Sequence, residues 1–271
     1  MEQKILLISG KKQSGKTSLS NFIHGYVMQK VSHCIEGFKI NEYGDLIVPA
    51  EFTDSQGNVE KKAGIIDLEN KTPEFINFAS QHIWPYVRAY SFADTLKGIS
   101  MRLFGLTYEQ CYGTDEDKNT LTEVKWKDIS FALPPRTVGE LKKSGELDQF
   151  MTAREFMQEF GTNICRKIRS NCWAFDTMER VVRDGAELAI IADCRFPDEL
   201  DVGVEYGAKS VRLLKKVGKS THKSETALDK NKNFDFSLDN SNMDIADKNM
   251  AVLEKLIQWE FVPPELAEVG N

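Results

Sequence analysis

Residues 10–17 read Gly-Lys-Lys-Gln-Ser-Gly-Lys-Thr and fill every fixed position of the phosphate-binding loop pattern G-x-x-x-x-G-K-[ST]. An apolar run at 5–8 precedes this loop, and a segment with helical character at 18–29 follows it. In such a strand–loop–helix unit, successive backbone N–H groups and the positive end of the helix hold phosphate oxygens. The pattern therefore predicts a site for the phosphates of a nucleoside triphosphate.

The polar side chains of this loop have expected tasks. Lys16 should reach the β- and γ-phosphates, and the hydroxyl of Thr17 should ligate Mg²⁺. Ser14, Gly15 and Ser18 complete the expected contacts with ATP, Ser18 as a second hydroxyl near the phosphates. The alternative is a chance glycine–serine turn after a strand, which the completely filled pattern makes the weaker explanation.

Strand and helix signals alternate along the chain, which is typical of an α/β fold with a parallel sheet. Besides the first strand, apolar runs predict strands at 87–92, 188–192, 210–214 and 234–238. Helices are predicted at 73–84, 93–104, 152–169, 173–183 and 246–260. We expect one domain over 1–271, in which 38–68 form a β-hairpin insertion. The polar stretch 113–150, which contains two prolines, is predicted to include loops.

Composition narrows the class of protein. The net charge of −6 argues against a dedicated nucleic-acid binder, which usually carries a basic face. No stretch has the length of a membrane span, and no apolar leader precedes the loop. Five cysteines without a C-x-x-C pair are typical of reduced thiols. We therefore expect a cytoplasmic protein with neither a stable nucleic-acid partner nor a membrane partner.

A phosphate loop is compatible with several reactions. A switch GTPase needs a guanine-reading Asn-Lys-x-Asp, and the Asn-Lys at 231–232 continues with Asn-Phe. A motor ATPase would have four apolar residues and then Asp, often followed by Glu; the run at 190–193 comes close, but Cys194 and Arg195 follow it. Arg195 instead brings a cation to the carboxyl end of a strand, where open α/β sheets bind ligands. This arrangement suits a charged acceptor or a phosphoryl group in transfer.

Several segments in order resemble phage deoxynucleoside monophosphate kinases. They are Ser-Phe-Ala-Asp-Thr-Leu-Lys at 91–97, Tyr-Gly-Thr-Asp-Glu-Asp-Lys-Asn at 112–119, Thr-Ala-Arg-Glu through Gly-Thr at 152–162 with Trp173, Asp193-x-Arg195 with Glu199, His-x-Ser-Glu at 222–225, and Leu-Asp-Asn at 238–240. The resemblance implies the fold of P-loop kinases, with a five-stranded parallel sheet flanked by helices and a mobile acceptor-binding region, here 92–170. Phosphomevalonate kinases share a similar core and remain a neighbouring alternative.

The resemblance also implies substrates and roles. ATP would donate its γ-phosphoryl group, with Mg²⁺, to a deoxynucleoside monophosphate (dNMP). Lys16, Asp193 and Arg195 would be catalytic, and Gln13 would face ATP where a family member has arginine. The implied acceptor-binding residues are Lys12, Lys97, Lys118, Arg154, Gly161, Thr162, Trp173, Asp193, Arg195 and Glu199. No general base is needed, because the acceptor phosphate is already anionic.

Each of these roles has a simpler alternative. Lys97, Lys118 and Arg154 are equally compatible with solvated surface charges, and Trp173 with a core tryptophan. Arg166 and Arg169 are candidates for closing over the phosphates or for a solvated helix face. Lys216 is a candidate for stacking on adenine, within a lysine-rich run that solvation also explains.

The sequence leaves three questions open. The preferred base and the choice between ribose and deoxyribose depend on the shape of a pocket. The insertion at 38–68 has no counterpart in the resemblance, and a homodimer contact is one role open to it. A nucleic-acid-stimulated ATPase remains the rival reaction from another class.

Overall fold

The computed structural model describes residues 3–53, 59–68, 70, 72–215, 227–229, 231 and 233–264. Contacts divide the chain into two compact units. The first, here called the loop unit, comprises Met1–Ser91 and Met178–Asn271 and contains the phosphate loop. The second, here called the inserted unit, comprises Phe92–Thr177.

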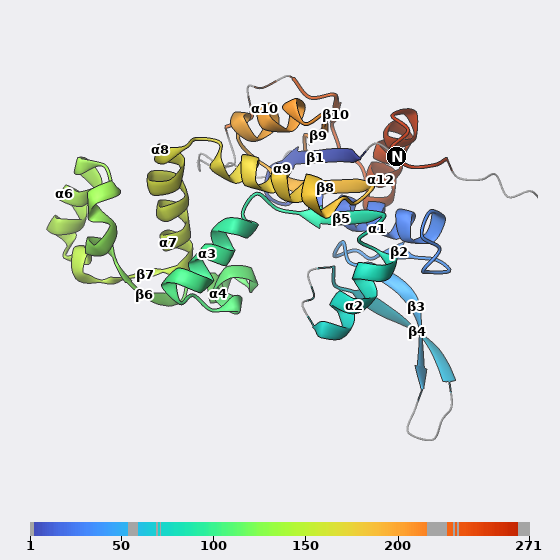
Figure 1. Ribbon diagram of the computed structural model, residues 1–271, viewed down its shortest axis with the longest axis horizontal. Helices are drawn as coiled ribbons and strands as arrows, with labels where there is room; N and C mark the ends of the chain where they lie inside the picture. Colours follow the sequence, from blue (N-terminus) through green and yellow to red (C-terminus); the bar gives the residue numbers. More distant parts are fainter. Residues whose placement is uncertain are drawn as a thin grey trace, which may run out of the picture. The chain divides into compact units, whose positions relative to one another are not determined.

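A five-stranded parallel sheet forms the centre of the loop unit (Figure 1). Its order is β10-β9-β1-β8-β5, so the strand that leads into the phosphate loop is central. The strands are β1 (Lys4–Gly10), β5 (Val87–Tyr90), β8 (Leu188–Cys194), β9 (Lys209–Leu213) and β10 (Phe236–Leu238). The predicted parallel sheet is therefore confirmed.

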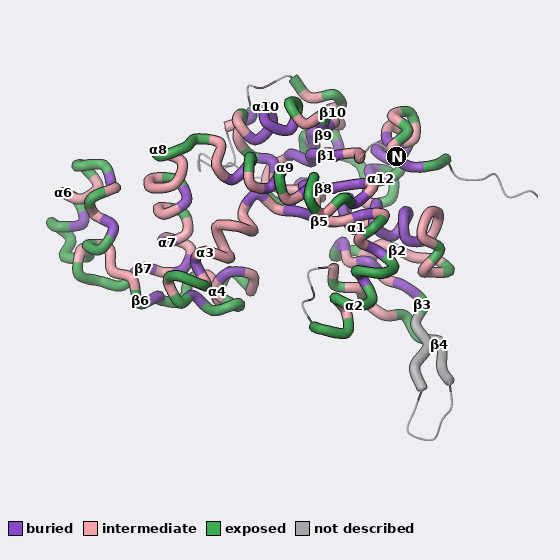
Figure 2. The backbone as a smooth tube through the Cα atoms, viewed as in Figure 1, coloured by how far each residue is buried: buried purple, intermediate pink, exposed green. Residues whose placement is uncertain are grey.

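Helices flank this sheet and bury it on both faces. The helices α1 (Lys16–Lys30), α9 (Cys172–Asp184), α10 (Pro197–Glu205) and α12 (Ile245–Gln258) have most of their residues in the loop unit. Burial on both faces explains why β1 and β8 are nearly continuous apolar runs (Figure 2). Among the described residues, every helix is too short or too polar to cross a lipid bilayer.

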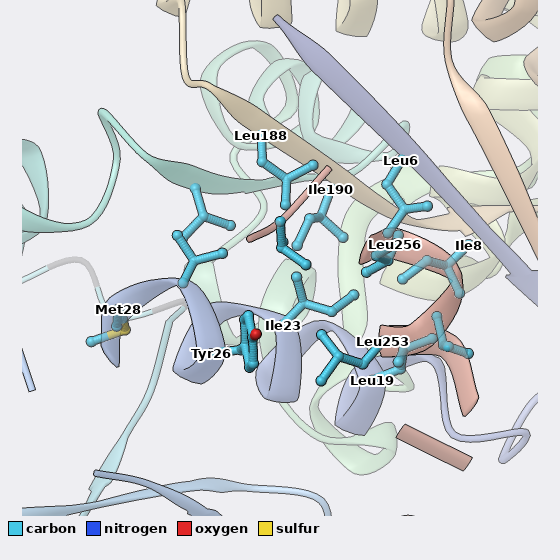
Figure 3. Packing of buried hydrophobic residues seen from close by; sticks show 14 of the residues in the cluster. Leu6, Ile8, Leu19, Ile23, Tyr26, Met28, Leu188, Ile190, Leu253 and Leu256 are labelled. Atoms are coloured by element: carbon cyan, nitrogen blue, oxygen red, sulfur yellow. The ribbon is translucent and has the colours of Figure 1, made fainter. Parts of the chain in front are cut away.

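The packing of α1 fixes the loop against the sheet. Leu19 and Ile23 of α1 are buried against β1, β8 and α12 (Figure 3), where they meet Leu6, Ile8, Ile190, Leu253 and Leu256. All of these side chains are at most 2% exposed, so the helix that follows the loop cannot shift without opening the core.

The β-hairpin predicted at 38–68 is also confirmed. The strands β2 (Lys39–Ile40), β3 (Leu46–Thr53) and β4 (Val59–Ile66) form an antiparallel sheet in the order β2-β3-β4. Leu46 is fully buried in the same core as α1, which attaches the hairpin to the loop unit. The helix α2 (Pro73–His82) follows it, with Thr72 as its side-chain cap.

The inserted unit has its own hydrophobic core. Its elements are α3 (Asp94–Phe104), α4 (Tyr108–Tyr112), α5 (Asp115–Lys118), β6 (Leu121–Lys125), η1 (Trp126–Ala132), α6 (Pro135–Ser144), η2 (Glu146–Asp148), β7 (Phe150–Thr152), α7 (Ala153–Glu159), η3 (Phe160–Cys165) and α8 (Arg166–Ile168). Leu106, Cys111, Met151 and Phe156 are among its buried residues. The stretch 113–150, predicted to include loops, consists largely of short elements joined by brief loops, and these elements contribute apolar side chains to this shared core.

Helix starts in the inserted unit follow local sequence signals. The capping box expected at Thr152 and Glu155 is present, with each residue's side chain accepting a backbone N–H from the other. The helical stretch that begins there continues through the π-helical turn η3 into α8. The predicted helix over 152–169 is therefore confirmed, with a local change of hydrogen-bond pattern at Phe160–Cys165.

Candidate functional site

The phosphate loop runs from the end of β1 to the start of α1. The Lys16 ammonium folds back over it and donates hydrogen bonds to the carbonyl oxygens of Gly10 (2.7 Å) and Lys11 (2.8 Å). Gln13 adopts a left-handed backbone conformation with φ of 63°, which is uncommon for a residue with a side chain. Such conformations cluster in loops that bind ligands, which agrees with the phosphate site predicted from the sequence.

Two residues from the C-terminal part of the chain hold the loop by hydrogen bonds. Lys248 of α12 donates hydrogen bonds to the Gly15 carbonyl oxygen (2.9 Å) and to the Ser18 hydroxyl (2.6 Å). The Asn240 amide donates to the carbonyl oxygen of Ser14 (2.9 Å). Gly15 has φ of +92°, and a Cβ there would lie 2.7 Å from the Lys248 ammonium. The second glycine of the loop therefore reflects this close approach.

Two cavities of the loop unit open onto the phosphate loop. The larger, here called the donor cavity, measures about 780 Å³ and is lined by residues 13–18, residues 40–44 and the start of α12. The smaller, here called the acceptor cavity, measures about 560 Å³ and lies at the carboxyl ends of β5 and β8. Gln13, Lys16 and Thr17 line both cavities. A group bound at these residues is therefore accessible from two sides.

The acceptor cavity collects the strand-end residues that the sequence singled out. Asp193 and Arg195 line it together with Lys12 and Ser91. The Ser91 hydroxyl donates a 2.6 Å hydrogen bond to Asp193, which joins the ends of the neighbouring strands β5 and β8. Glu199 is 3% exposed, and its carboxylate accepts hydrogen bonds from the backbone N–H of Arg195 (2.7 Å) and of Phe196. These bonds fix the turn that carries Arg195.

The oxygen atoms at the loop fit a hard divalent cation. Thr17 is exposed and lines both cavities, and Asp193 contributes a carboxylate to the acceptor cavity. Mg²⁺ prefers such oxygen ligands and completes its shell with water and phosphate oxygens. The Thr17 hydroxyl is the protein group that would hold the metal together with the nucleotide.

The inserted unit contains three of the cations predicted for the acceptor: Lys97, Lys118 and Arg154. Arg154 donates to Asp115 (2.7 Å) and to Asn119 (3.2 Å), on either side of Lys118 in the sequence. Burial raises the pKa of the Cys111 thiol, and the charges of Lys97 and Lys118 oppose this shift, so both lysines lie near that thiol. The Lys97 ammonium also lies 4.1 Å from the centre of the Tyr112 ring. The three cations thus lie on or beside α4 and α5.

Other predicted residues of the inserted unit have packing contacts. Trp173 is 7% exposed, and its indole N–H donates to the Gly161 carbonyl oxygen (3.3 Å), which favours a role in packing over base stacking. Thr162 is exposed in η3. Arg166 donates to the carbonyl oxygen of Ser170, and the Arg169 guanidinium lies 4.1 Å from the centre of the Phe175 ring. The predicted Lys216 and the segment 222–225 lie outside the described residues.

Sequence reasoning assigned no role to Lys248, Asn240 or Ser91. A signal for Lys248 does exist, because Lys248, Val252 and Leu256 repeat every four residues along one helical stripe and all three are buried. A lysine on a buried stripe needs a partner, and here the partner is the phosphate loop. Asn240 and Ser91 fall inside family-like segments, but their contacts depend on the tertiary structure.

Comparison with known proteins gives one informative similarity. No protein-family model matches the chain. A curated protein of Acanthamoeba polyphaga mimivirus, named "Putative deoxynucleotide monophosphate kinase", is 27% identical over 153 residues, which are 56% of this chain and 74% of the relative. This similarity supports a kinase-like relationship, and it leaves the substrate of this chain to be established.

Proposed function

We propose that the protein is an ATP-dependent deoxynucleoside monophosphate kinase. The observation that carries the proposal is the sharing of Gln13, Lys16 and Thr17 between the two cavities. A phosphoryl group at these residues can meet one substrate on each side, which a two-substrate transfer requires and a simple nucleotide hydrolase does not. The family-like segments and the name of the mimivirus relative support a dNMP as the acceptor.

The lining of each cavity supports the assignment of donor and acceptor. The donor cavity contains the whole run 13–18, whose backbone N–H groups and helix start suit a triphosphate. The acceptor cavity adds Lys12 and Arg195 to Lys16, so that three cationic side chains line it. A nucleoside monophosphate carries about two negative charges near neutral pH, and arginine can bind such a group bidentately.

The transfer then needs no covalent enzyme intermediate. An oxygen of the acceptor phosphate forms a bond to the γ-phosphorus of ATP, and the bond from this phosphorus to the β,γ-bridging oxygen breaks. ADP leaves with the electron pair of that bond, and the acceptor becomes a deoxynucleoside diphosphate. Lys16 and Arg195 stabilise the negative charge on the oxygens in transfer. The Thr17 hydroxyl would hold Mg²⁺ together with ATP, and the metal would supply positive charge to the phosphates.

A coupled kinase assay over the common ribo- and deoxyribonucleoside monophosphates tests the proposal. We expect ATP- and Mg²⁺-dependent formation of diphosphates from one or more dNMPs. Lys16→Ala should fold normally and lose on the order of 10²-fold or more in rate, because it removes a positioned charge. If ATP turnover requires DNA or RNA and no dNMP becomes a diphosphate, the kinase assignment is wrong and the ATPase alternative replaces it.

A further inference from the structure

The turn between β2 and β3, residues 41–45, has a fixed conformation. The side-chain oxygen of Asn41 accepts hydrogen bonds from the backbone N–H of Tyr43 (3.0 Å) and of Asp45 (2.8 Å). The Asn41 amide also donates to the Asp45 carboxylate (3.0 Å), and its backbone N–H donates to the Asp45 carbonyl oxygen (3.1 Å). Side-chain-to-backbone bonds of this kind define the path of a tight turn. The turn can therefore present Tyr43 in a defined place.

This turn lies against the start of α1. The Asn21 amide of α1 donates a 2.8 Å hydrogen bond to the Gly44 carbonyl oxygen. Gly44 has φ of +92°, and a Cβ there would lie 2.8 Å from the Cβ of Ser18. Only glycine allows both this backbone conformation and this approach. The hairpin insertion is thus attached to the helical turn that carries the last residues of the phosphate loop.

Tyr43 is an exposed aromatic side chain that lines the donor cavity. It is 82% exposed, so it contributes nothing to the hydrophobic core that buries Leu46 a few residues later. It lines the same cavity as Gly15, Lys16 and Thr17 and is absent from the lining of the acceptor cavity, in which Asp45 takes part. Apolar side chains complete this lining, from Ile40, Met243 and Ile245. An aromatic ring beside a phosphate site has the chemistry to stack on a base.

We propose that Tyr43 is the stacking platform for the base of the donor nucleotide. This inference rests on the proposed function, because it takes the donor cavity to hold a nucleoside triphosphate. The phosphate loop holds the triphosphate, and the turn at 41–45, attached to α1, holds the backbone of Tyr43 at a fixed place relative to that loop. Every nucleobase offers a π-face, so this contact adds affinity for the nucleoside part and little selectivity among bases. The insertion thereby acquires a task in substrate binding.

Calorimetry with ATP and with inorganic tripolyphosphate separates the base from the phosphates. We expect Tyr43→Ala to bind ATP about 10-fold more weakly, which corresponds to about 1.4 kcal/mol. Tripolyphosphate has no base. Its affinity for Tyr43→Ala should therefore differ from its affinity for the wild type by less than about 2-fold, a free-energy difference smaller than RT. Tyr43→Phe keeps the ring and should bind ATP like the wild type. Phe131→Ala, at an 80% exposed aromatic of the inserted unit, is the matched control and should change neither affinity.

Three results would overturn the inference. Wild-type affinity of Tyr43→Ala for ATP would mean that the ring does not contact the base. An equal loss for ATP and tripolyphosphate would mean that the turn acts on the phosphate loop itself. A wild-type protein that binds neither ligand would remove the proposed function together with this inference. ATP binding that depends on Tyr43 without transfer to any dNMP supports the platform and rejects the kinase, so the two failures are distinguishable.

Discussion

Lys248 donates a 2.9 Å hydrogen bond to the carbonyl oxygen of Gly15 and so ties the C-terminal helix to the phosphate loop. The lysine is 2% exposed, and a second bond of 2.6 Å joins it to the Ser18 hydroxyl. Burial, together with the charge of Lys215, lowers the pKa of Lys248 to about 8. A buried cation therefore lines the same cavity as the phosphate loop, and its charge changes within an accessible pH range.

The free energy of unfolding should register the titration of Lys248. The folded-state pKa of about 8 lies below the ordinary 10.5, so between these values the unfolded chain binds the extra proton. The contribution of Lys248 to the free energy of unfolding must then rise with pH through that window. Relative to Lys248→Met, the wild type should gain about 2 kcal/mol between roughly pH 7.5 and pH 9.5. Urea denaturation of both proteins at the two pH values measures this gain, and a pH-independent difference would contradict it.

His24 should produce a dependence in the acid range. It is 1% exposed in α1, its Nδ1 lies 2.8 Å from the Ser20 carbonyl oxygen, and burial lowers its pKa to about 4. The unfolded chain binds the extra proton between about pH 4 and pH 6.5, so stability is lost as pH falls through that window. A pKa depression of this size corresponds to a loss of about 3 kcal/mol in the free energy of unfolding over the whole window.

The variant His24→Leu isolates this contribution from the protonation of carboxylates. It keeps an apolar side chain in the core and removes the titrating ring. Its free energy of unfolding should fall less than that of the wild type between roughly pH 7 and pH 4.5, where the imidazole titration contributes. Parallel falls in the two proteins, followed by circular dichroism in urea, would show that His24 is not the group responsible.

Much of the fold was predictable because its signals are local. The phosphate loop is a contiguous motif, and the buried run of β8 identifies a strand covered on both faces. The capping box at Thr152 also lies within four residues. The inserted unit was harder, because its core joins residues as distant as Leu106 and Met151 from short elements. No single one of these elements has a periodicity long enough to be recognised.

Residues of the candidate site were predictable from the sequence only where they belong to a recognisable motif. Lys12, Lys16 and Thr17 follow from the loop, and Asp193 and Arg195 from a strand end. The contacts of Lys248 with Gly15 and of Ser91 with Asp193 join residues 233 and 102 positions apart, and no pattern in one sequence encodes them. The contact of Ser91 with Asp193 follows from sheet order, which places β5 beside β8.

Arg195 should act on the chemical step. It is exposed in the acceptor cavity, and the backbone bonds to Glu199 hold its turn. Arg195→Ala should lower the single-turnover rate at saturating ligands by on the order of 10²-fold, because a charge positioned for the transferring group is lost. Arg195→Lys keeps the charge and loses the planar fork, so an intermediate rate is expected.

A matched arginine controls for general effects of charge removal. Arg183 is exposed on α9, pairs with Asp184, and does not line either cavity. Arg183→Ala should therefore retain the wild-type rate in the same rapid-quench experiment. A wild-type rate for Arg195→Ala would mean that the guanidinium has no part in transfer and that its turn is a structural feature of α10.

Arg154 should contribute to acceptor affinity. In the inserted unit its guanidinium already contacts Asp115 and Asn119, so a dNMP phosphate would compete with a carboxylate for it. Arg154→Ala should weaken dNMP binding about 10- to 100-fold, the loss of a hydrogen bond to a charged group. ATP binding should be nearly unchanged. Isothermal titration of each ligand alone measures both, and an equal loss for ATP would remove Arg154 from the acceptor site.

A variant of Asp115, the carboxylate that competes for Arg154, should change dNMP affinity in the opposite direction. Asp115→Asn keeps the shape of the side chain and removes its charge. The Arg154 guanidinium then loses a weaker interaction when it moves to a phosphate. Acceptor affinity should therefore rise by a small factor, in line with the modest strength of an exposed ion pair. Arg136→Ala, which breaks the exposed pair with Glu140, is the control for surface charge and should leave dNMP affinity unchanged. A loss of dNMP affinity in Asp115→Asn would mean that this carboxylate positions Arg154 rather than competing for it.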